Sequence, residues 1–268
     1  MCITVFMWEA HPLYPFLFFF NRDEYHSRPT EPLGWWEGGE ILGGRDGEAG
    51  GTWLASSKDG RFAFVTNFRE VECLPQAKSR GQLPVRFLQS KKKPIEFAEE
   101  VVKEADQYNG FNLILVDICL KSMVYVTNRP TERGNLIEEV SPGIHVLTNA
   151  SLDSPWPKAQ RLDHKFKEVL AKYSKHELLP LKEMVAELMM DTTKDDDSSR
   201  LPNIYSPETE YNLSSIFIDF NSPLGRYGTR NQSGLSVRSN GEVCFLERYF
   251  DKDIWKEQTV TYQIEMTI

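Results

Sequence analysis

The sequence has few cysteines and no motif that would pair them. Its 268 residues include Cys2, Cys73, Cys119 and Cys244, which are widely separated and form no CxxC pair. Secreted scaffolds held together by disulfides carry a much higher density of cysteine, and scattered cysteines are typical of a reducing compartment. The sequence therefore favours a cytoplasmic protein.

Long apolar runs and an excess of positive charge are also missing. No stretch approaches the roughly 18 apolar residues of a membrane-spanning helix, and the longest run, Phe16 to Phe20, has the length of a strand. The first thirty residues contain acidic side chains and resemble neither a signal peptide nor a transit peptide. The net charge of −8 disfavours a general binder of nucleic acid or anionic membranes. We therefore expect no integral membrane segment and no nucleic-acid partner.

Several familiar catalytic and metal-binding motifs are absent as well. No Gly-x-Ser-x-Gly elbow supports a serine triad, and the glycine-rich stretch from Gly38 to Gly51 is not followed by the Gly-Lys-Ser/Thr of a phosphate loop. The five histidines show no metal-ligand spacing. The run Asp195-Asp196-Asp197 lacks the glycine and the closing glutamate of a calcium loop. We therefore expect no metal site, and we interpret the polar segment of residues 191–211 as a mobile surface loop.

Apolar patterning predicts strands at both ends of the chain and pairs of amphipathic helices in its middle. The order of elements is strands, two helices, strands, two helices, and then a strand meander. This order lacks the strict strand–helix alternation of doubly wound folds and barrels. Two mostly antiparallel sheets stacked face to face, with helix layers outside, use every element. We therefore predict a single domain over residues 1–268, of the α+β class, with four layers αββα.

The individual elements follow from local signals such as Asp59-Gly60 and Asn240-Gly241, which are typical of hairpin turns. Strands are expected at residues 2–8, 16–20, 52–57, 61–68, 111–117, 123–127, 213–220, 234–238, 242–250 and 259–266. Helices are expected at about residues 79–90, from 94, from 155 to 173, and around 181–188. The unbroken apolar run at residues 16–20 indicates a strand that is buried on both faces.

Cys2 is the first candidate for chemistry. Removal of Met1 would leave one residue with a thiol nucleophile and a free α-amine that can act as its base. The alternative is that Cys2 is only a small apolar residue at the start of a strand, and position alone favours this alternative. The rest of the sequence must decide between the two.

Four polar residues, Asn21-Arg22-Asp23-Glu24, follow the apolar run directly. A hairpin between this strand and the first one would bring Cys2 close to residues 21–23. Arg22 and Asp23 are adjacent, and neighbouring residues of a strand point to opposite faces. Asn67, Asn149 and Arg230 stand at or beyond the ends of other strand-like runs, where an isolated residue more often belongs to a turn.

A set of motifs, taken together and in this order, resembles the NRDE family, also called the Transport and Golgi organisation protein two homologues. The resemblance runs from the first residue to the last strand, and no single motif carries it. The motifs are Met1-Cys2-Ile3, Asn21-Arg22-Asp23-Glu24-Tyr25, Ser27-Arg28-Pro29, Gly50-Gly51-Thr52-Trp53-Leu54, Thr66-Asn67, Tyr108-Asn109-Gly110-Phe111-Asn112-Leu113, Leu147-Thr148-Asn149-Ala150 and Tyr227-Gly228-Thr229-Arg230.

The resemblance implies an N-terminal nucleophile hydrolase-like fold related to cysteine-type acylases, which cleave linear amides. In those enzymes the N-terminal Cys attacks the amide carbonyl and its α-amine, with a pKa of about 7.7 to 8.0, takes the thiol proton. An Arg favours the thiolate, and Asn donors stabilise the oxyanion. The matching positions in this sequence are Cys2, Arg22, Asp23, Asn67, Asn149 and Arg230.

One departure from the acylases concerns the second strand. In the acylases two residues separate the Arg from the Asp, whereas Arg22 and Asp23 are adjacent. Either the backbone breaks at Asn21, or only one of the two side chains serves Cys2.

Three functions therefore stay open: a Cys amidohydrolase acting on a linear amide or thioester, a non-catalytic carrier of haem or of an acyl-type ligand, and a trafficking adaptor. The resemblance also implies roles in haem trafficking, lipid and mitochondrial homeostasis and Golgi organisation. It further implies that mitochondria or the Golgi are possible locations beside the cytoplasm. No cofactor is required, haem is a candidate cargo, and the sequence predicts no oligomeric state.

Overall fold

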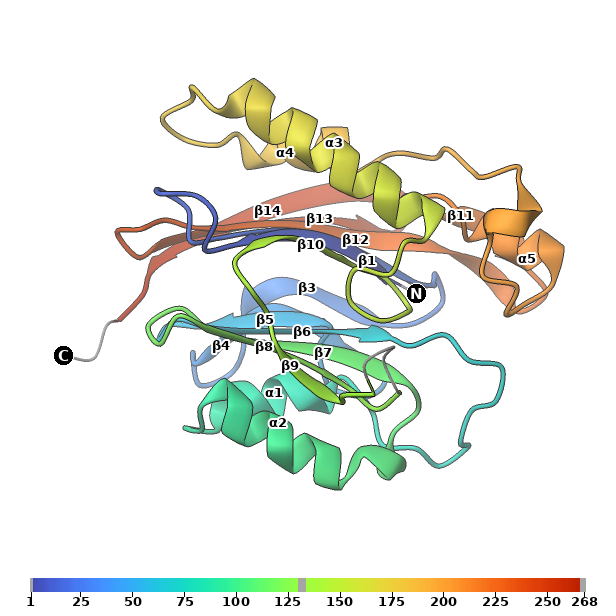
Figure 1. Cartoon of the computed structure of the whole chain (residues 1–268), viewed down its shortest axis with the longest axis horizontal. Coiled ribbons are helices and arrows are strands. Elements are labelled where there is room, and N and C mark those ends of the chain that lie inside the picture. The colour runs from blue at the N-terminus through green and yellow to red at the C-terminus, as the bar shows by residue number, and fades with distance from the viewer. Residues whose placement is uncertain (1, 130–133, 266–268) are drawn as a thin grey trace.

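Two seven-stranded antiparallel sheets, stacked face to face, form the centre of the molecule (Figure 1). The computed structural model describes residues 2–129 and 134–265. The first sheet has the order β10-β1-β2-β12-β13-β14, with β11 paired to β12. Its strands are β1 (Cys2–Trp8), β2 (Phe16–Tyr25), β10 (Gly143–Leu147), β11 (Asp219–Ser222), β12 (Gly225–Val237), β13 (Glu242–Asp251) and β14 (Ile254–Gln263).

The second sheet runs in sequence order from β3 to β9. Hairpins connect most of its neighbours, and the turn at Gly60 has the positive φ that Asp-Gly hairpins require. Its strands are β3 (Thr30–Trp35), β4 (Ile41–Asp46), β5 (Leu54–Ser57), β6 (Arg61–Asn67), β7 (Phe111–Asp117), β8 (Ser122–Thr127) and β9 (Ile137–Glu139).

Helices cover the outer faces of the two sheets (Figure 1). The first sheet is covered by α3 (Pro157–Tyr173) and α4 (Leu181–Met189), and the second by α1 (Gln82–Gln89) and α2 (Pro94–Lys103). The short helices are η1 (Ala105–Gln107), η2 (Ser198–Arg200) and α5 (Pro207–Asn212). The four-layer αββα arrangement predicted from the order of elements is confirmed. Within the described residues, no helix is both long and apolar enough to cross a membrane.

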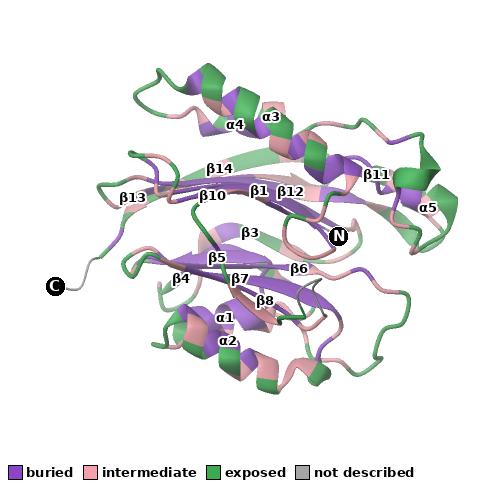
Figure 2. Cartoon of the chain, in the orientation of Figure 1, coloured by how far each residue is buried: buried purple, intermediate pink, exposed green. Residues whose placement is uncertain are grey.

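The alternation of side chains along β2 explains its unbroken apolar run. Phe16, Phe18 and Phe20 point into the layer between the sheets, whereas Leu17 and Phe19 pack under α3 and α4. Because both faces of the strand are covered, no position in this run needs a polar side chain. Figure 2 shows the same pattern, with the strands mostly buried and the helices buried where they face a sheet.

Some predicted elements differ from the structure. Residues 213–217 form turns, and the strand expected there is limited to β11. Leu213 and Ile216 are buried because the segment packs against α3, so their hydrophobicity reflects burial and not strand pairing. β14 begins earlier than expected, at Ile254, and Met266 at the expected end lies outside the described residues. The short or glycine-containing strands β3, β4, β9 and β10 were not predicted.

The segment of residues 191–211, predicted as a mobile loop, contains η2 and the first residues of α5. An ion pair anchors it, because Glu210 Oε2 lies 2.8 Å from Arg69 Nη2 with both side chains buried. Asp195, in the aspartate run, pairs with Arg200 at 3.3 Å. The mobility of this segment stays a prediction.

Candidate active site

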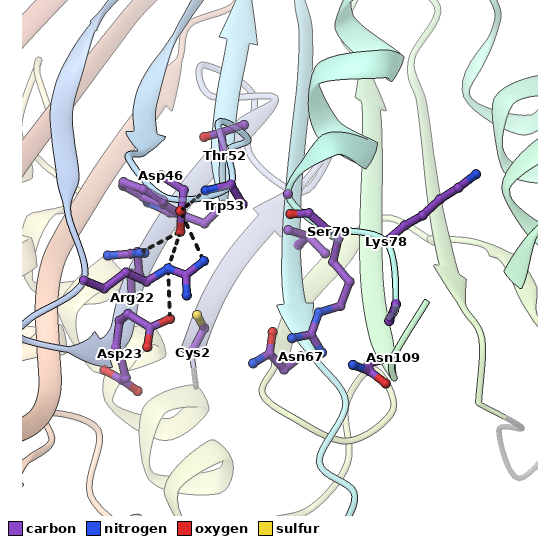
Figure 3. A pocket seen from close by; sticks show the side chains of 17 residues that line it. Cys2, Arg22, Asp23, Asp46, Thr52, Trp53, Asn67, Lys78, Ser79 and Asn109 are labelled. Carbon is purple, nitrogen blue, oxygen red and sulfur yellow. Dashed lines mark hydrogen bonds and ion pairs between the residues drawn. The ribbon is translucent and has the colours of Figure 1, made fainter. Parts of the chain in front are cut away.

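A cavity of about 300 Å³ opens where β1 begins and where β2 passes from apolar to polar residues. Four of the six candidate residues line it: Cys2, Arg22, Asp23 and Asn67. In Figure 3, Arg22, Asp46 and Trp53 lie on one side of Cys2, with Asn67, Ser79 and Asn109 on the other. The fold therefore brings together residues that the sequence separates by up to about two fifths of the chain, from Cys2 to Asn109.

Cys2 and Arg22 share one face of the first sheet. They are direct partners in the antiparallel pairing of β1 with β2, so the predicted hairpin is confirmed. Cys2 is only 8% exposed, and burial raises the pKa of its thiol, while the Arg22 guanidinium acts in the opposite direction. The thiol is therefore protonated at rest and needs a base before it can attack a carbonyl.

The Arg22 guanidinium is held by both sheets. It donates hydrogen bonds to the Thr30 hydroxyl at 3.1 Å and to the Asn231 amide oxygen at 3.5 Å, and it pairs with Asp46 at 3.4 Å. It also stacks on the Trp53 ring, 4.3 Å from the ring centroid. These contacts fix a charge that otherwise has several free rotamers, and they fix it beside Cys2.

Asp46 balances the positive charge in this part of the site. It accepts hydrogen bonds from Arg28 Nε at 2.7 Å and from the backbone N–H groups of Glu48 and Ala49. Burial alone would raise its pKa, but the hydrogen bonds from Arg28 and from these amides outweigh it and lower the pKa. Asp46 is therefore ionised at neutral pH and serves two arginines at once.

Asp23 leaves β2 on the face opposite to Arg22. Its carboxylate accepts a hydrogen bond from the Thr229 hydroxyl at 2.7 Å, and its carbonyl accepts one from the Tyr227 hydroxyl at 3.1 Å. Burial raises its pKa to about 6, although Lys158 and Thr229 act to lower it. Lys158 is itself buried, which lowers its pKa to about 8, and it donates to the Leu213 carbonyl at 3.0 Å. The region behind Cys2 thus holds two groups that titrate near neutrality.

Asn67 and Asn149 are joined to each other, but only Asn67 lines the cavity. Asn149 Nδ2 donates to the Asn67 carbonyl at 2.9 Å, and the Asn149 carbonyl accepts the backbone N–H of Arg69 at 2.7 Å. Among the described residues, the buried Oδ1 atom of Asn149 has no hydrogen-bond partner. Asn149 therefore fixes the end of β6 that carries Asn67.

Arg230 lies behind the cavity wall and is not among the residues that line it. It occupies a bulge where the pairing of β12 with β2 shifts between Thr229 and Asn231. Its guanidinium donates to the carbonyls of Tyr25 and Arg28 and to the Thr30 hydroxyl. In this arrangement Arg230 holds the turn after β2.

The sequence did not identify several residues of the cavity wall, among them Arg28, Asp46, Lys78 and Arg80. Lys78 and Arg80 precede α1, where the sequence indicated only a helix start at Ser79. Arg80 is partly buried, which lowers its pKa, and it donates to the Gly110 carbonyl at 2.9 Å. The cluster Gly50-Gly51-Thr52-Trp53 did signal a shaped loop, and Thr52 and Trp53 line the cavity.

The lining includes four cationic side chains, of Arg22, Arg28, Lys78 and Arg80, and three acidic ones, of Asp23, Glu24 and Asp46. None of the described residues that line the cavity is a histidine. Among the described residues, no group of three or more His, Cys, Asp or Glu side chains is arranged to hold a metal ion. The arrangement is a polar cavity with charged groups of both signs next to a thiol.

Two solved structures resemble the chain at low sequence identity. A Cys-to-Ala variant of the conjugated bile acid hydrolase of Clostridium perfringens is 8% identical with a TM-score of 0.47, covering 100% of this chain and 99% of that one. The N-acylethanolamine-hydrolyzing acid amidase orthologue of Caenorhabditis elegans is 12% identical with a TM-score of 0.38, covering 80% of this chain and 98% of that one.

Sequence comparison gives a closer relationship. The Transport and Golgi organization 2 homologues of Mus musculus and Homo sapiens are each 31% identical to the chain over 281 aligned residues, with 99% of both proteins covered. The family model for Transport and Golgi organisation 2 matches residues 1–252. The chain therefore belongs to the Transport and Golgi organisation 2 family.

Proposed function

We propose that the Cys2 cavity binds an acyl-type amide or thioester that carries an anionic group, and that Cys2 cleaves it once Met1 has been removed. The observation that carries this proposal is the position of the Cys2 thiol, on the same sheet face as Arg22 and within a polar cavity. A thiol next to a fixed cation can be converted to a thiolate more readily than an isolated buried thiol.

The chemical steps need no group beyond the chain, the substrate and water. The Cys2 sulfur attacks the acyl carbon, and the free α-amine of Cys2 takes the thiol proton. When the C–N or C–S bond breaks, that proton passes to the departing amine or thiol. Water then attacks the acyl-enzyme thioester, which releases the carboxylic acid and returns the thiol. Asn67 on the opposite wall is the candidate donor to the oxyanion.

The charge of the lining supports an anionic substrate. Arg28, Lys78 and Arg80 stand around the cavity. Asp46 already pairs with Arg22 and Arg28, and Glu104 pairs with Lys78 at 3.1 Å. Among the described residues Arg80 has no ion-pair partner, so its guanidinium is the positive charge of the lining that is most available to a ligand. Arginine and lysine together bind carboxylate, phosphate or sulfonate groups well.

Haem as a cargo is the second candidate, and the same cations favour it because they could pair with the propionate groups. Of the described residues that line the cavity, Cys2 is the one whose side chain could ligate iron, and its raised pKa weakens it as a ligand. The cavity also stands at the lower limit of ligand-site volumes, about 300 Å³. Roles in haem trafficking, lipid or mitochondrial homeostasis and Golgi organisation, and a location in the cytoplasm, mitochondria or Golgi, stay proposals from the family resemblance.

The deciding experiment is incubation of the full chain with an electrophilic acyl probe, followed by mass mapping of the adduct and of the N-terminus. The proposal expects loss of Met1 and an adduct on Cys2 that Cys2→Ala abolishes and Cys73→Ala retains. An adduct confined to the exposed Cys73 or Cys119, or full biological activity with Met1 retained, would contradict it. A haem titration by absorbance with Cys2→Ala tests the second candidate, which requires the variant to change the bound spectrum.

A further inference from the structure

Glu247 on β13 is a buried carboxylate outside the cavity lining. It is 2% exposed and lies in the layer between the sheets, where burial raises its pKa to about 7. A carboxylate in such a place costs free energy unless hydrogen bonds satisfy its oxygens. The hydrogen-bond partners of the Glu247 carboxylate therefore indicate which part of the structure it stabilises.

Both carboxylate oxygens of Glu247 are occupied. Oε1 accepts from Asn231 Nδ2 at 3.1 Å, and Oε2 accepts from the backbone N–H of Leu33 at 2.6 Å. Gln258 Nε2 lies 3.5 Å from Oε2 and donates to the Leu33 carbonyl at 2.6 Å. One arm of this network thus joins the first sheet to β3, and the other arm leads to Asn231.

Asn231 connects Glu247 to the cavity. Its Oδ1 atom accepts from Arg22 Nη1 at 3.5 Å. The ionised Glu247 can only accept and a guanidinium can only donate, so the Asn231 amide then presents its nitrogen to Glu247 and its oxygen to Arg22. Glu247 therefore fixes which way this amide points.

We propose that Glu247 is a positioning residue that holds the Arg22 guanidinium beside Cys2 through the Asn231 amide. Arg22 is also drawn toward the second sheet, where Asp46 and Thr30 bind it. Asn231 supplies a contact from β12 of the first sheet, which flanks β2 on the side opposite to β1 and Cys2. This contact ties the guanidinium to the sheet that carries Cys2, and without it the guanidinium keeps its contacts to Asp46 and Thr30 of the second sheet. The inference rests on the proposed function only in taking the Cys2 cavity as the working site.

The test is the rate at which Cys2 reacts with iodoacetate relative to iodoacetamide, measured by peptide mapping of the full chain. A cation aimed at the thiol accelerates the anionic reagent over the neutral one, and Arg22→Gln gives the ratio without that cation. The exposed Cys119 in the same molecules is the internal reference. Alkylation needs neither substrate turnover nor removal of Met1, so a failure of the proposed hydrolysis leaves this test intact.

The direction in which the iodoacetate-to-iodoacetamide ratio changes distinguishes a loss of Arg22 positioning from a simple change in local charge. Glu247→Gln removes a negative charge, which by itself would raise the iodoacetate ratio. Loss of Arg22 positioning instead lowers it, and we expect a decrease of roughly tenfold, toward the value of Arg22→Gln. Asn231→Leu leaves the Glu247 side chain in place but removes its connection to Arg22, and it should lower the ratio equally, with no further decrease in the double variant.

Gln258→Leu is the matched control, because it removes the hydrogen bonds of Gln258 to the Leu33 carbonyl and to Glu247 and leaves the arm to Arg22 in place. It should lower stability without changing the ratio. The proposal is overturned by an unchanged or raised ratio in Glu247→Gln, or by an unchanged ratio in Asn231→Leu. If Glu247→Gln does not fold, the Asn231→Leu result decides alone.

Discussion

Cys2 and Arg22 are directly opposite each other in the pairing of β1 with β2, so both side chains leave the sheet toward the layer between the sheets. β2 is continuous from Phe16 to Tyr25, and its backbone does not break at Asn21. Strand alternation therefore assigns Arg22 to the thiol and Asp23 to the opposite face, with Thr229. Asp23 still reaches the cavity wall. The adjacency of the two residues is thus compatible with one site in which they have separate tasks.

Gly51 allows the close approach that forms one wall of the cavity. A Cβ atom at Gly51 would lie 2.4 Å from the Gly81 carbonyl carbon and 2.9 Å from the Gln82 nitrogen. We expect Gly51→Ala to push the start of α1 away and to cost about 1 to 3 kcal/mol of unfolding free energy. Urea denaturation measures this loss of unfolding free energy. Acyl-probe labelling of Cys2 should also slow, because the cavity wall is displaced. Gly34→Ala, where the nearest atom is 3.9 Å away, is the control, and equal stability of both variants would refute the expectation.

The buried ion pair of Arg69 and Glu210 should be strongly coupled. The two side chains are 3% and 1% exposed, and the pair joins the loop after β6 to α5. Removing one partner leaves a buried charge without compensation, so Arg69→Met and Glu210→Gln should each cost about 3 to 5 kcal/mol. The double variant should cost clearly less than their sum.

Chemical denaturation of the two single variants and the double variant measures this coupling. The exposed pair of Arg226 and Asp219, with the same 2.8 Å separation, provides the control cycle. Its coupling should stay within about 1 kcal/mol, because water screens exposed charges. If the two single-variant losses of unfolding free energy add up to that of the double variant, the contact between Arg69 and Glu210 contributes no stability.

Local patterns predicted the parts of the fold that depend on neighbouring residues. The apolar run at residues 16–20 predicted a strand covered on both faces, and its hairpin with β1 brought Cys2 to Arg22. The strands that were missed have weak local signals. β9 has three residues, and β3 pairs with β4 through a register shift between Glu31 and Gly34. Their pairing depends on the second sheet as a whole and not on their own periodicity.

Residue patterns predicted the site where a single hairpin forms it, at Cys2 and residues 21–23, and the family resemblance added Asn67. Pairing of β2 with β12 joins residues about 200 positions apart and sets Thr229 and Asn231 beside Asp23 and Arg22. No periodicity reports such a distant pairing. Asp46 likewise comes from the opposite sheet, and its two arginine partners become visible only when the sheets are stacked.

Stability should fall with rising pH because of Glu247. Its pKa is raised by burial from 4.5 to about 7, so between these values the folded state binds more protons than the unfolded state. The free energy of unfolding then decreases as the pH rises through this range, by on the order of 2 to 3 kcal/mol. Glu247→Gln should lose this part of the slope, as measured by urea denaturation from pH 4.5 to 8. Glu183→Gln, on the exposed face of α4, should keep the wild-type slope. The same dependence of unfolding free energy on pH in all three proteins would show that the pKa of Glu247 is not raised in the folded state.

Lys158 should have the opposite effect at higher pH. It is buried in the first turn of α3, where the helix dipole also disfavours a cation, and its pKa is lowered from 10.5 to about 8. Between these values the unfolded state binds the additional proton, so the wild-type free energy of unfolding should rise with pH.

Lys158→Met should remove this rise, whereas Lys165→Met on the exposed side of α3 should keep it. Urea denaturation between pH 7.5 and 10 compares the three proteins. Loss of Lys158 also removes a positive charge that lowers the Asp23 pKa. If Asp23 controls the reactivity of Cys2, the rate at which the acyl probe labels Cys2 decreases as Asp23 becomes protonated, and in Lys158→Met this decrease at acidic pH should move to higher pH. A flat wild-type stability profile would mean that Lys158 keeps an ordinary pKa. A decrease in labelling that stays at the wild-type pH in Lys158→Met would mean that Asp23 does not control the reactivity of Cys2.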